Sequence, residues 1–335
     1  MTSILTNTAA MAALQTLRAI DSSMEETQGR VSSGLRVGSA ADNAAYWSIA
    51  TTMRSDNMAL SAVQDALGLG AAKVDTAYAA MESAIDVVKE IKAKVVAATE
   101  QGVDKAKIQE EIKQLQLQLT SIAEAASFSG ENWIGGGIDT GTAPLDATVV
   151  SGFVRDSSGT VKVTTTQYTL DASTVGSMTL LFGGAATTGV IDPATGILGS
   201  VAGTFDAVID WGNDGTTGTP ATEVDAMSIA TLDITAFGDA AVGMAEALTL
   251  VEYGLQAMTS AAAALGSISM RVGLQEDFVS KLTDSIDAGI GRLVDADMNE
   301  ESTRLKALQT QQQLGIQSLS IANSNSENIL QLFRQ

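Results

Sequence analysis

The chain has 335 residues, enough for two or three domains of ordinary size. Its 39 acidic and 19 basic residues give a formal net charge of −20, which argues against nucleic acid and anionic membranes as partners. The chain has no histidine and no cysteine, which excludes imidazole and thiolate metal sites, Ser-His and Cys-His nucleophile pairs and disulfides. Carboxylate chemistry and a purely structural role remain possible.

The N-terminal segment shows no targeting signal. Residues 1–20 have no basic region, and polar residues interrupt every apolar run, so a Sec-type signal peptide is excluded. No stretch approaches the roughly 18 apolar residues of a transmembrane helix. These features favour a cytoplasmic protein, whereas the absence of cysteine weakly favours export.

Residues 1 to about 130 contain no proline and have the spacing of amphipathic helices. A first helix is predicted as far as Gly34 and Gly38, because glycine is unfavourable in helix interiors. Its apolar line is formed by Ala10, Ala13, Leu17, Ile20, Met24, Thr27 and Val31. The longest line is a heptad seam, the pattern of a helix that packs lengthwise on a partner helix. This seam consists of Leu60, Val63, Leu67, Gly70, Val74, Ala77, Met81, Ala84, Val88, Ile91, Val95 and Ala98.

Three more helices are predicted. One follows the turn at Gly102 and Asp104, the second of which is a favourable N-cap. Its apolar stripe is Ile108, Ile112, Leu115, Leu119, Ile122 and Ala126. Helix resumes near residue 237, with a line that shifts by one residue at Ile268 and comprises Met244, Leu248, Val251, Leu255, Met258, Ala262, Leu265, Val272, Gln275, Val279, Leu282, Ile286, Gly289 and Leu293. The last helix has a line at Leu305, Leu308, Gln312, Gly315, Leu319, Ala322, Ser326, Ile329 and Phe333.

The segment between the helical ends, residues 131–236, differs in composition. It holds all three prolines, and its two basic and 12 acidic residues give it a net charge of −10. Short β-prone runs alternate with turn residues, which predicts a β-rich insert on the surface of a helical rod. The predicted strands are 147–154 and 160–170, separated by a turn at 156–159, and then 178–182, 204–211 and 227–235.

Three local motifs suggest chemistry. Residues 138–142 match the Asp-Thr-Gly loop of aspartic proteases, but the chain has no second such loop to complete the carboxylate pair. Residues 210–221 resemble a calcium loop, but Ala221 stands where a bidentate Glu is required. Residues 183–189 lack the lysine of a phosphate-binding loop. We interpret all three segments as turns.

The predicted fold is therefore mainly α: a long antiparallel, coiled-coil-like rod formed by both chain ends, with a β-rich central insert. An ordinary monomeric helical bundle accounts for the same periodicity. Several independent motifs that agree in order favour the rod. Residues 31–45, VSSGLRVGSAADNAA, resemble the signature LSSGLRINSAxDDAA that follows the first helix of bacterial flagellins. Ser127–Gly130, Asp295–Met298 and the ending from Asn328 resemble later motifs of that family, in the same order.

The resemblance to bacterial flagellins covers about two thirds of the chain. It implies a structural subunit of the flagellar filament, exported unfolded by a type III apparatus and self-assembling outside the cell into a helical tube for swimming motility. Residues 1–44 and 295–335 would be inner filament-core helices, 45–135 and 237–294 a helical rod, and 136–236 an outer variable domain. The implied partners are other flagellin subunits, an export chaperone, and hook-associated and cap proteins. No enzyme activity, cofactor, metal, nucleic acid or membrane is implied.

The resemblance also implies site residues. Self-assembly is expected to use the inner helices at Leu17, Ile20, Met24, Val31, Leu305, Leu308, Leu319, Ile329 and Phe333. An innate-receptor epitope of the family, reading close to R-V-R-E-L, would be degenerate here, at Val87, Lys89, Glu90 and Ile91. A hook–filament junction protein of the same superfamily is the alternative function. Flagellins with a zinc protease in the insert are excluded, because that protease requires histidine.

Overall fold

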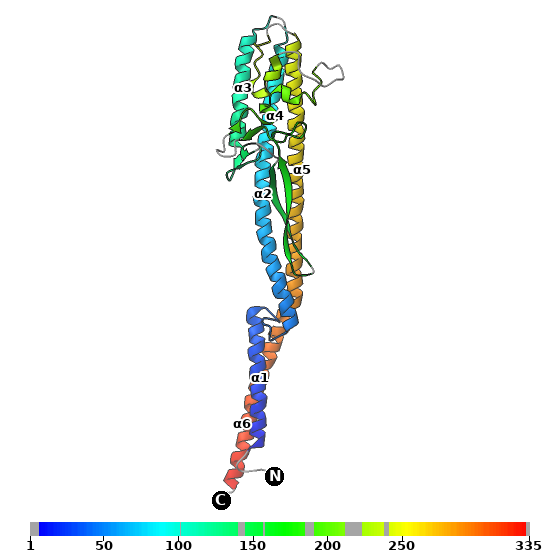
Figure 1. Cartoon of the computed structure of the whole chain (residues 1–335). Helices are drawn as coiled ribbons and strands as arrows, with labels where there is room; N and C mark the ends of the chain where they lie inside the picture. Colours follow the sequence, from blue (N-terminus) through cyan, green and yellow to red (C-terminus); the bar gives the residue numbers. More distant parts are fainter. Residues whose placement is uncertain are drawn as a thin grey trace. The chain divides into compact units, whose positions relative to one another are not determined.

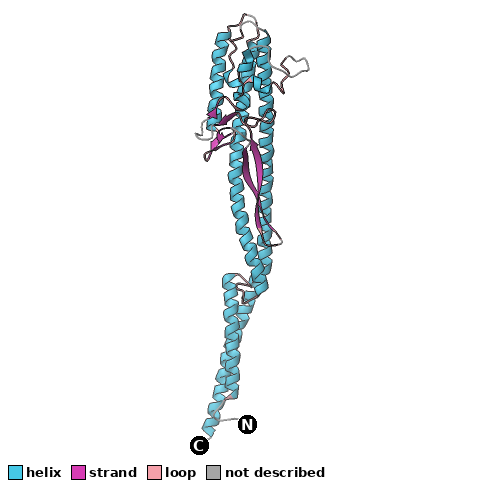
Figure 2. Cartoon of the chain, viewed as in Figure 1, coloured by secondary structure: helices cyan, strands magenta, loops and turns pink. Residues whose placement is uncertain are grey.

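The computed structural model describes residues 7–100, 102–139, 145–156, 158–184, 191–211, 223–237 and 241–332, and of residues 136–139, 223, 241 and 325–332 it describes the backbone. The chain divides into two compact units. The first comprises residues 1–59 with 281–335, and the second comprises residues 60–280. Long helices dominate the described residues, and strands occur only in the middle of the chain, which confirms the predicted fold class (Figure 2).

The first unit is built on a pair of antiparallel helices, α1 (Thr8–Ser33) and α6 (Met298–Leu332) (Figure 1). The side chain of Asn7 accepts a hydrogen bond from the backbone N–H of Ala10 and caps the start of α1. Gly34, with φ of +72°, ends α1 in the left-handed conformation that glycine adopts without strain. The chain ends therefore pair with each other, and α1 stops at the predicted glycine.

The same unit contains the start of α2 (Ala44–Ala97) and the end of α5 (Ala241–Val294). The backbone N–H groups of Arg36 and Val37 both donate to the carbonyl of Val294, at 2.7 and 3.2 Å. A small apolar cluster forms around this contact, made of Val37, Ala50, Ile290 and Val294. It anchors the segment between α1 and α2 against the end of α5.

In the second unit, α2 and α5 run antiparallel and bury the predicted seam. Ser269 donates to Asp75 at 2.9 Å, and Lys92 forms an ion pair with Glu252, so the two helices are in register over a long stretch. Every member of the α2 seam from Leu60 to Ala98 is buried. The heptad prediction for this helix is confirmed.

The third helix of this unit, α3 (Lys105–Ala125), begins as predicted at Asp104, whose carboxylate accepts from the N–H of Lys107 at 3.4 Å. The buried face of α3, however, is displaced by one residue from part of the predicted apolar stripe. Gln109 and Gln116 are buried, whereas Ile108 and Leu115 are half-buried. Two glutamines thus occupy positions that the apolar pattern assigned to neighbouring aliphatic residues.

The insert begins with a tight hairpin of β1 (Ser127–Phe128) and β2 (Glu131–Asn132). Its two-residue turn has positive φ at Ser129 and Gly130, the geometry of a type I′ turn. A longer antiparallel hairpin follows, β4 (Leu145–Arg155) with β5 (Val161–Leu170), close to the predicted strands. A small sheet orders β3 (Gly135–Asp139), β6 (Phe182–Gly184) and β7 (Ile191–Asp192), with β3 parallel and β7 antiparallel to β6.

Three predicted strands are wrong. Of residues 178–182 only Phe182 is in a strand, and 204–211 and 227–235 form short helical turns and loops. The short helices in this part of the insert are α4 (Gly196–Gly199) and the 3₁₀ helices η1 (Ala202–Phe205), η2 (Glu223–Ala226) and η3 (Ile229–Thr231), of which η1 overlaps 204–211 and η3 lies within 227–235. Their apolar residues are buried, as in a strand, but their backbone groups find partners other than a neighbouring strand.

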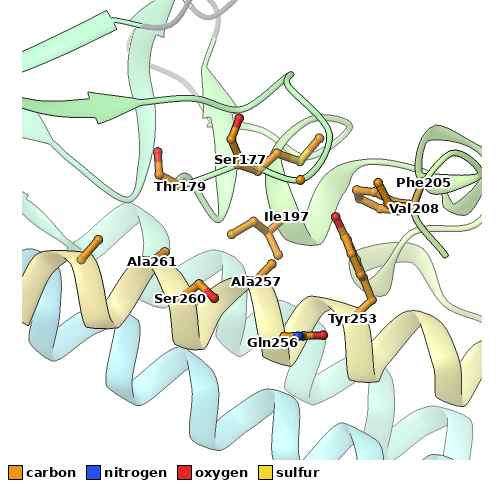
Figure 3. A pocket seen from close by; sticks show the side chains of 13 residues that line it. Ser177, Thr179, Ile197, Phe205, Val208, Tyr253, Gln256, Ala257, Ser260 and Ala261 are labelled. Atoms are coloured by element: carbon orange, nitrogen blue, oxygen red, sulfur yellow. The ribbon is translucent and has the colours of Figure 1, made fainter.

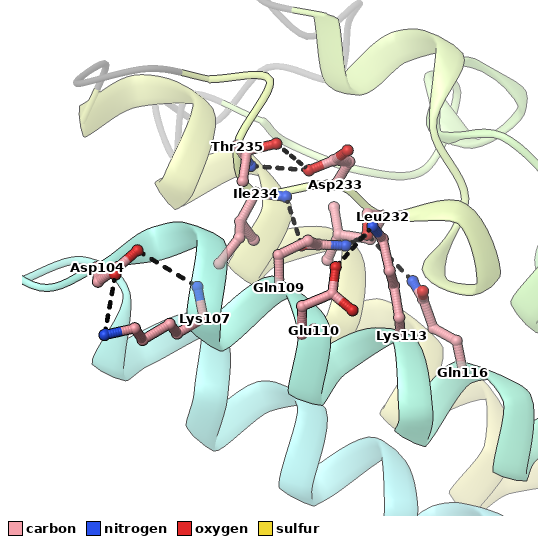
Figure 4. Close-up of polar contacts among 10 residues, drawn as sticks. All are labelled: Asp104, Lys107, Gln109, Glu110, Lys113, Gln116, Leu232, Asp233, Ile234 and Thr235. Carbon is pink, nitrogen blue, oxygen red and sulfur yellow. Dashed lines mark hydrogen bonds and ion pairs between the residues drawn. The ribbon is translucent and has the colours of Figure 1, made fainter.

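The buried glutamines of α3 provide some of those partners (Figure 4). The amide nitrogen of Gln109 donates to the carbonyl of Leu232 at 2.9 Å, and its amide oxygen accepts from the N–H of Ile234 at 2.9 Å. Gln116 donates to the carbonyls of Ile229 and Leu232, at 3.0 and 3.1 Å. The segment around η3 is thus held by helix side chains in place of a β-ladder.

The insert packs on the helices of its own unit, which confirms its predicted place on the surface of a rod. A Cβ added to Gly70 of α2 would lie 2.2 Å from a methyl group of Val149, so glycine lets the β4–β5 hairpin approach the helix. Arg271 of α5 donates to Thr166 of β5 at 3.3 Å. Phe205 of η1 packs on Tyr253 of α5, with ring centroids 4.9 Å apart.

The turn after β5 should make the stability of the insert sensitive to acid. Burial would raise the pKa of Asp171, but hydrogen bonds from Thr174 and Ser173 outweigh burial and lower it. A depressed pKa means that the carboxylate stabilises the fold above its ordinary pKa of about 3.9 and loses this contribution as the pH falls through the folded-state value. Below pH 4 we expect the second unit to unfold at a lower midpoint concentration of urea. The substitution Asp171→Asn should make this decrease smaller. Asp65→Asn, at an exposed site on α2, is the control.

Candidate assembly surface

The residues predicted for self-assembly lie on the facing sides of α1 and α6. Those with described side chains are all half-buried: Leu17, Ile20, Met24, Val31, Leu305, Leu308 and Leu319. Ile329 lies in the part of α6 of which the structure describes only the backbone, and Phe333 is outside the described residues. Gly315 lies against Leu17, because a Cβ at this position would be 3.3 Å from Leu17 Cγ. The structure therefore brings the two predicted sets together as one seam.

Polar contacts fix the register of this helix pair. The side-chain amide of Asn7 donates to the carbonyl of Ala322 at 2.9 Å, and that of Gln312 donates to Asp21 at 2.7 Å. Near the other end, Arg30 forms an ion pair with Glu301 at 3.3 Å. Only 9% of the Glu301 side chain is exposed, so this ion pair is screened less by solvent than a surface pair.

Few side chains of the α1–α6 seam are completely buried. Thr27 is the only fully buried residue of α1, and Glu301 is the only one among residues 298–324 of α6. Complete burial of a leucine contributes about 1.5–3 kcal/mol, and half-buried residues contribute correspondingly less. Helix stability in proteins comes mainly from packing of an apolar face. Among the described residues, the packing between α1 and α6 therefore leaves most of this seam only partly buried.

Apolar side chains are also exposed outside the seam. In residues 7–59 and 281–324 the large exposed ones are Met11, Leu14, Tyr46, Trp47, Ile49, Met58, Met298, Leu314, Ile316 and Ile321. Exposed apolar patches on a soluble chain mark interaction surfaces. Together with the partly buried seam, they make the first unit a candidate interaction surface.

Possible metal ligands, pockets and membrane spans were compared over the described residues. Among the parts of the chain in view, no three acidic side chains cluster closely enough to hold a metal ion. A pocket of about 360 Å³ lies between α5 and the insert, beside Tyr253, and its lining has no charged side chain (Figure 3). None of the helices in the described residues combines the length and hydropathy of a membrane span. Most of the three motifs noted above, namely residues 140–142, 185–189 and 212–221, lies outside the described residues.

The four epitope residues on α2 are not presented together. Val87 and Ile91 are buried, with exposed fractions of 7% and 0%. Lys89 and Glu90 are exposed, and Lys89 forms an ion pair with Asp86 at 2.9 Å. Only the two charged residues of this segment are therefore available to a protein that approaches the helix from solvent.

Comparison with known proteins identifies the family. The model of the bacterial flagellin N-terminal helical region matches residues 4–138, and that of the C-terminal helical region matches residues 248–333. The chain belongs to the bacterial flagellin family. Flagellin D and Flagellin A of Rhizobium meliloti (strain 1021) are 59% and 57% identical to it, and a flagellin of Brucella melitensis biotype 1 is 41% identical. Each alignment covers 100% of both chains.

Membership of the flagellin family shows which assembly the chain belongs to. The chain is a structural subunit of the flagellar filament, which polymerises with other flagellin subunits. The helical ends that match the family models include all of α1 and α6, the two helices that form the partly buried seam. Sequence reasoning missed Arg30, Glu301 and the exposed pair Tyr46 and Trp47.

Proposed function

We propose that the chain is exported unfolded through the flagellar type III apparatus and polymerises outside the cell into the tube that drives swimming. The assembly step is supported by the incomplete burial of the α1–α6 seam, since Thr27 is the only fully buried residue of α1. Neighbouring subunits would supply the missing cover. The long helices, which depend on packing for stability, are compatible with passage through an export channel as an unfolded chain.

In this proposal the filament has three layers. Residues 1–44 and 295–335 form the inner core, 45–135 and 237–294 the helical rod, and 136–236 the outer variable domain. The expected partners during export and assembly are a chaperone, the hook-associated proteins and a cap protein. The chain has a mechanical role and no catalytic one. A hook–filament junction protein is not favoured, since relatives that match the chain over its full length are flagellins.

Seeded polymerisation tests the proposal. Purified chain is added to short filament fragments and examined by negative-stain electron microscopy. We expect the fragments to elongate into tubes of constant diameter, faster at higher ionic strength because the net charge of −20 makes subunits repel one another. Soluble protein that never elongates the fragments at any salt concentration would contradict the proposal.

We expect the chain to be a weak activator of the innate receptor that recognises flagellins. The family segment begins with an arginine, and this chain has the buried Val87 at the matching position. Loss of a guanidinium removes a charge-assisted, fork-shaped donor from the contact. A reporter-cell assay compares monomeric wild type with Val87→Arg, which should be the more potent. Full potency of the wild type would show that the alignment of this segment is wrong.

A further inference from the structure

The first unit carries a groove between α1 and α6 that its own side chains leave open. The groove has a volume of about 430 Å³ and is lined by Ala13, Thr16, Ile20, Gln311, Leu314, Gly315 and Ser318. Its lining includes Gly315, which has no side chain, and the short side chains of Thr16 and Ser318. Ile20 and Leu314 make it apolar, and the amide of Gln311 and the hydroxyls offer hydrogen-bond acceptors.

The same unit carries an exposed aromatic pair at the start of α2. Trp47 is 37% exposed and Tyr46 is 42% exposed, whereas the other two tryptophans of the chain, Trp133 and Trp211, are 4% and 7% exposed. A flat indole with one N–H donor matches an apolar groove whose lining also offers acceptors. Tryptophan and tyrosine also dominate the binding energy of many protein interfaces.

Trp47 cannot fill the groove of its own chain. The groove residues of α1 lie 13 to 20 residues before Ser33, which is about 20–30 Å along the helix at roughly 1.5 Å per residue. Trp47 is held beyond that end, because Ala50 of the same helix packs in the cluster with Val37 and Val294. The ring and the groove are therefore two separate surfaces of one chain.

We propose that Trp47 of one subunit docks in the α1–α6 groove of a second copy of this chain. A knob and a hole at different places on one molecule make a head-to-tail contact, which repeats from subunit to subunit and builds an open helical polymer when the rotation between subunits does not close a ring. Each subunit then uses its indole on one neighbour and its groove on another. The inference rests on the proposed polymerisation. It names one contact by which a neighbouring subunit buries part of the α1–α6 seam.

Fluorescence of the wild-type chain tests burial of Trp47. With Trp133 and Trp211 buried, acrylamide should quench mainly Trp47 in the monomer. Polymerisation should lower the quenching constant severalfold. Filaments whose tryptophan emission is quenched as strongly as that of the monomer would overturn the inference and leave the proposed function intact, whereas a wild-type chain that forms no filaments would overturn both.

Single cysteines identify the occupant of the groove, since the chain has none of its own. Trp47→Cys and Ser318→Cys are mixed with seeds and a thiol oxidant. A disulfide-linked dimer should form in mixed filaments and not in filaments of either variant alone. Met58→Cys, at a residue that is 70% exposed, replaces Trp47→Cys in the control mixture and should give no dimer. Equal cross-linking in both mixtures, or in neither, would contradict the contact.

Filling the groove provides an independent measurement. Ser318→Leu should raise the critical concentration for seeded growth by about tenfold, the effect of losing one aromatic anchor. Ser320→Leu, the same change at an exposed position that does not line the groove, should grow like the wild type. Circular dichroism must show equal helix content for both variants. Normal growth of Ser318→Leu would count against the docking of Trp47.

Discussion

Removal of residues 1–30, or of residues 305–335, should leave a soluble helical protein that no longer polymerises. Either deletion removes one side of the seam, so the remaining helix of the pair has no partner for its half-buried residues. The second unit, residues 60–280, keeps its buried α2–α5 seam and should stay folded. Seeded elongation, followed by light scattering and electron microscopy, measures the loss, and urea unfolding reports on the second unit.

A point substitution separates the role of the seam from that of chain length. Leu17→Asp places a charge on the half-buried line opposite Gly315 and should also abolish elongation. Gln15→Asp introduces the same charge at an exposed position of α1 and should have a small effect. Normal filaments from either truncation, or equal loss with both substitutions, would show that the seam is not required for assembly.

Replacement of the two buried glutamines of α3 should strongly destabilise the second unit. Gln109→Leu leaves the buried N–H of Ile234 without its acceptor, and Gln116→Leu leaves the carbonyl of Ile229 without its donor. A buried polar group left unpaired costs about 1–3 kcal/mol. We therefore expect each variant to lower the free energy of unfolding by that amount, measured by urea denaturation of the second unit.

Both glutamines donate to the carbonyl of Leu232, so their effects should not be additive. The double variant removes both donors from this carbonyl and should lose more stability than the sum of the single variants. Gln118→Leu is the matched control, because it makes the same change at an exposed position of α3. A stability loss as large in Gln118→Leu as in Gln116→Leu would mean that the substitution acts through helix properties and not through the buried hydrogen bonds.

The long helices could be predicted from the sequence because their signals are local. Apolar spacing marks the seam of α2, and capping residues mark ends, as at Gly34 and Asp104. The β4–β5 hairpin belongs to the same class, since neighbouring residues carry its turn chemistry, whereas the turn at Ser129 and Gly130 is expected only from the resemblance to flagellins. The antiparallel pairing of α1 and α6 was predicted from two matching seams at opposite ends of the chain.

The insert could be predicted less well because its buried backbone has distant partners. A run such as 227–235 is apolar enough for a strand, but whether it finds a neighbouring strand depends on residues far away in the sequence. Here Gln109 and Gln116, more than 110 positions earlier, supply the hydrogen bonds. Glutamine is usually a surface residue, and only the folded structure brings it to the carbonyl groups that make its burial favourable.

For the assembly surface, too, some properties could be predicted from the sequence and others could not. Amphipathic periodicity identifies the residues that form the seam, because it records which side of each helix avoids water. It does not record how completely that side is covered. The half-burial of Leu17 and Leu319, the open groove at Gly315 and the exposed ring of Trp47 follow from the separation and register of helices that are hundreds of residues apart in the chain. Solvent exposure is a property of packed surfaces, so it emerged only when the helices were placed beside one another.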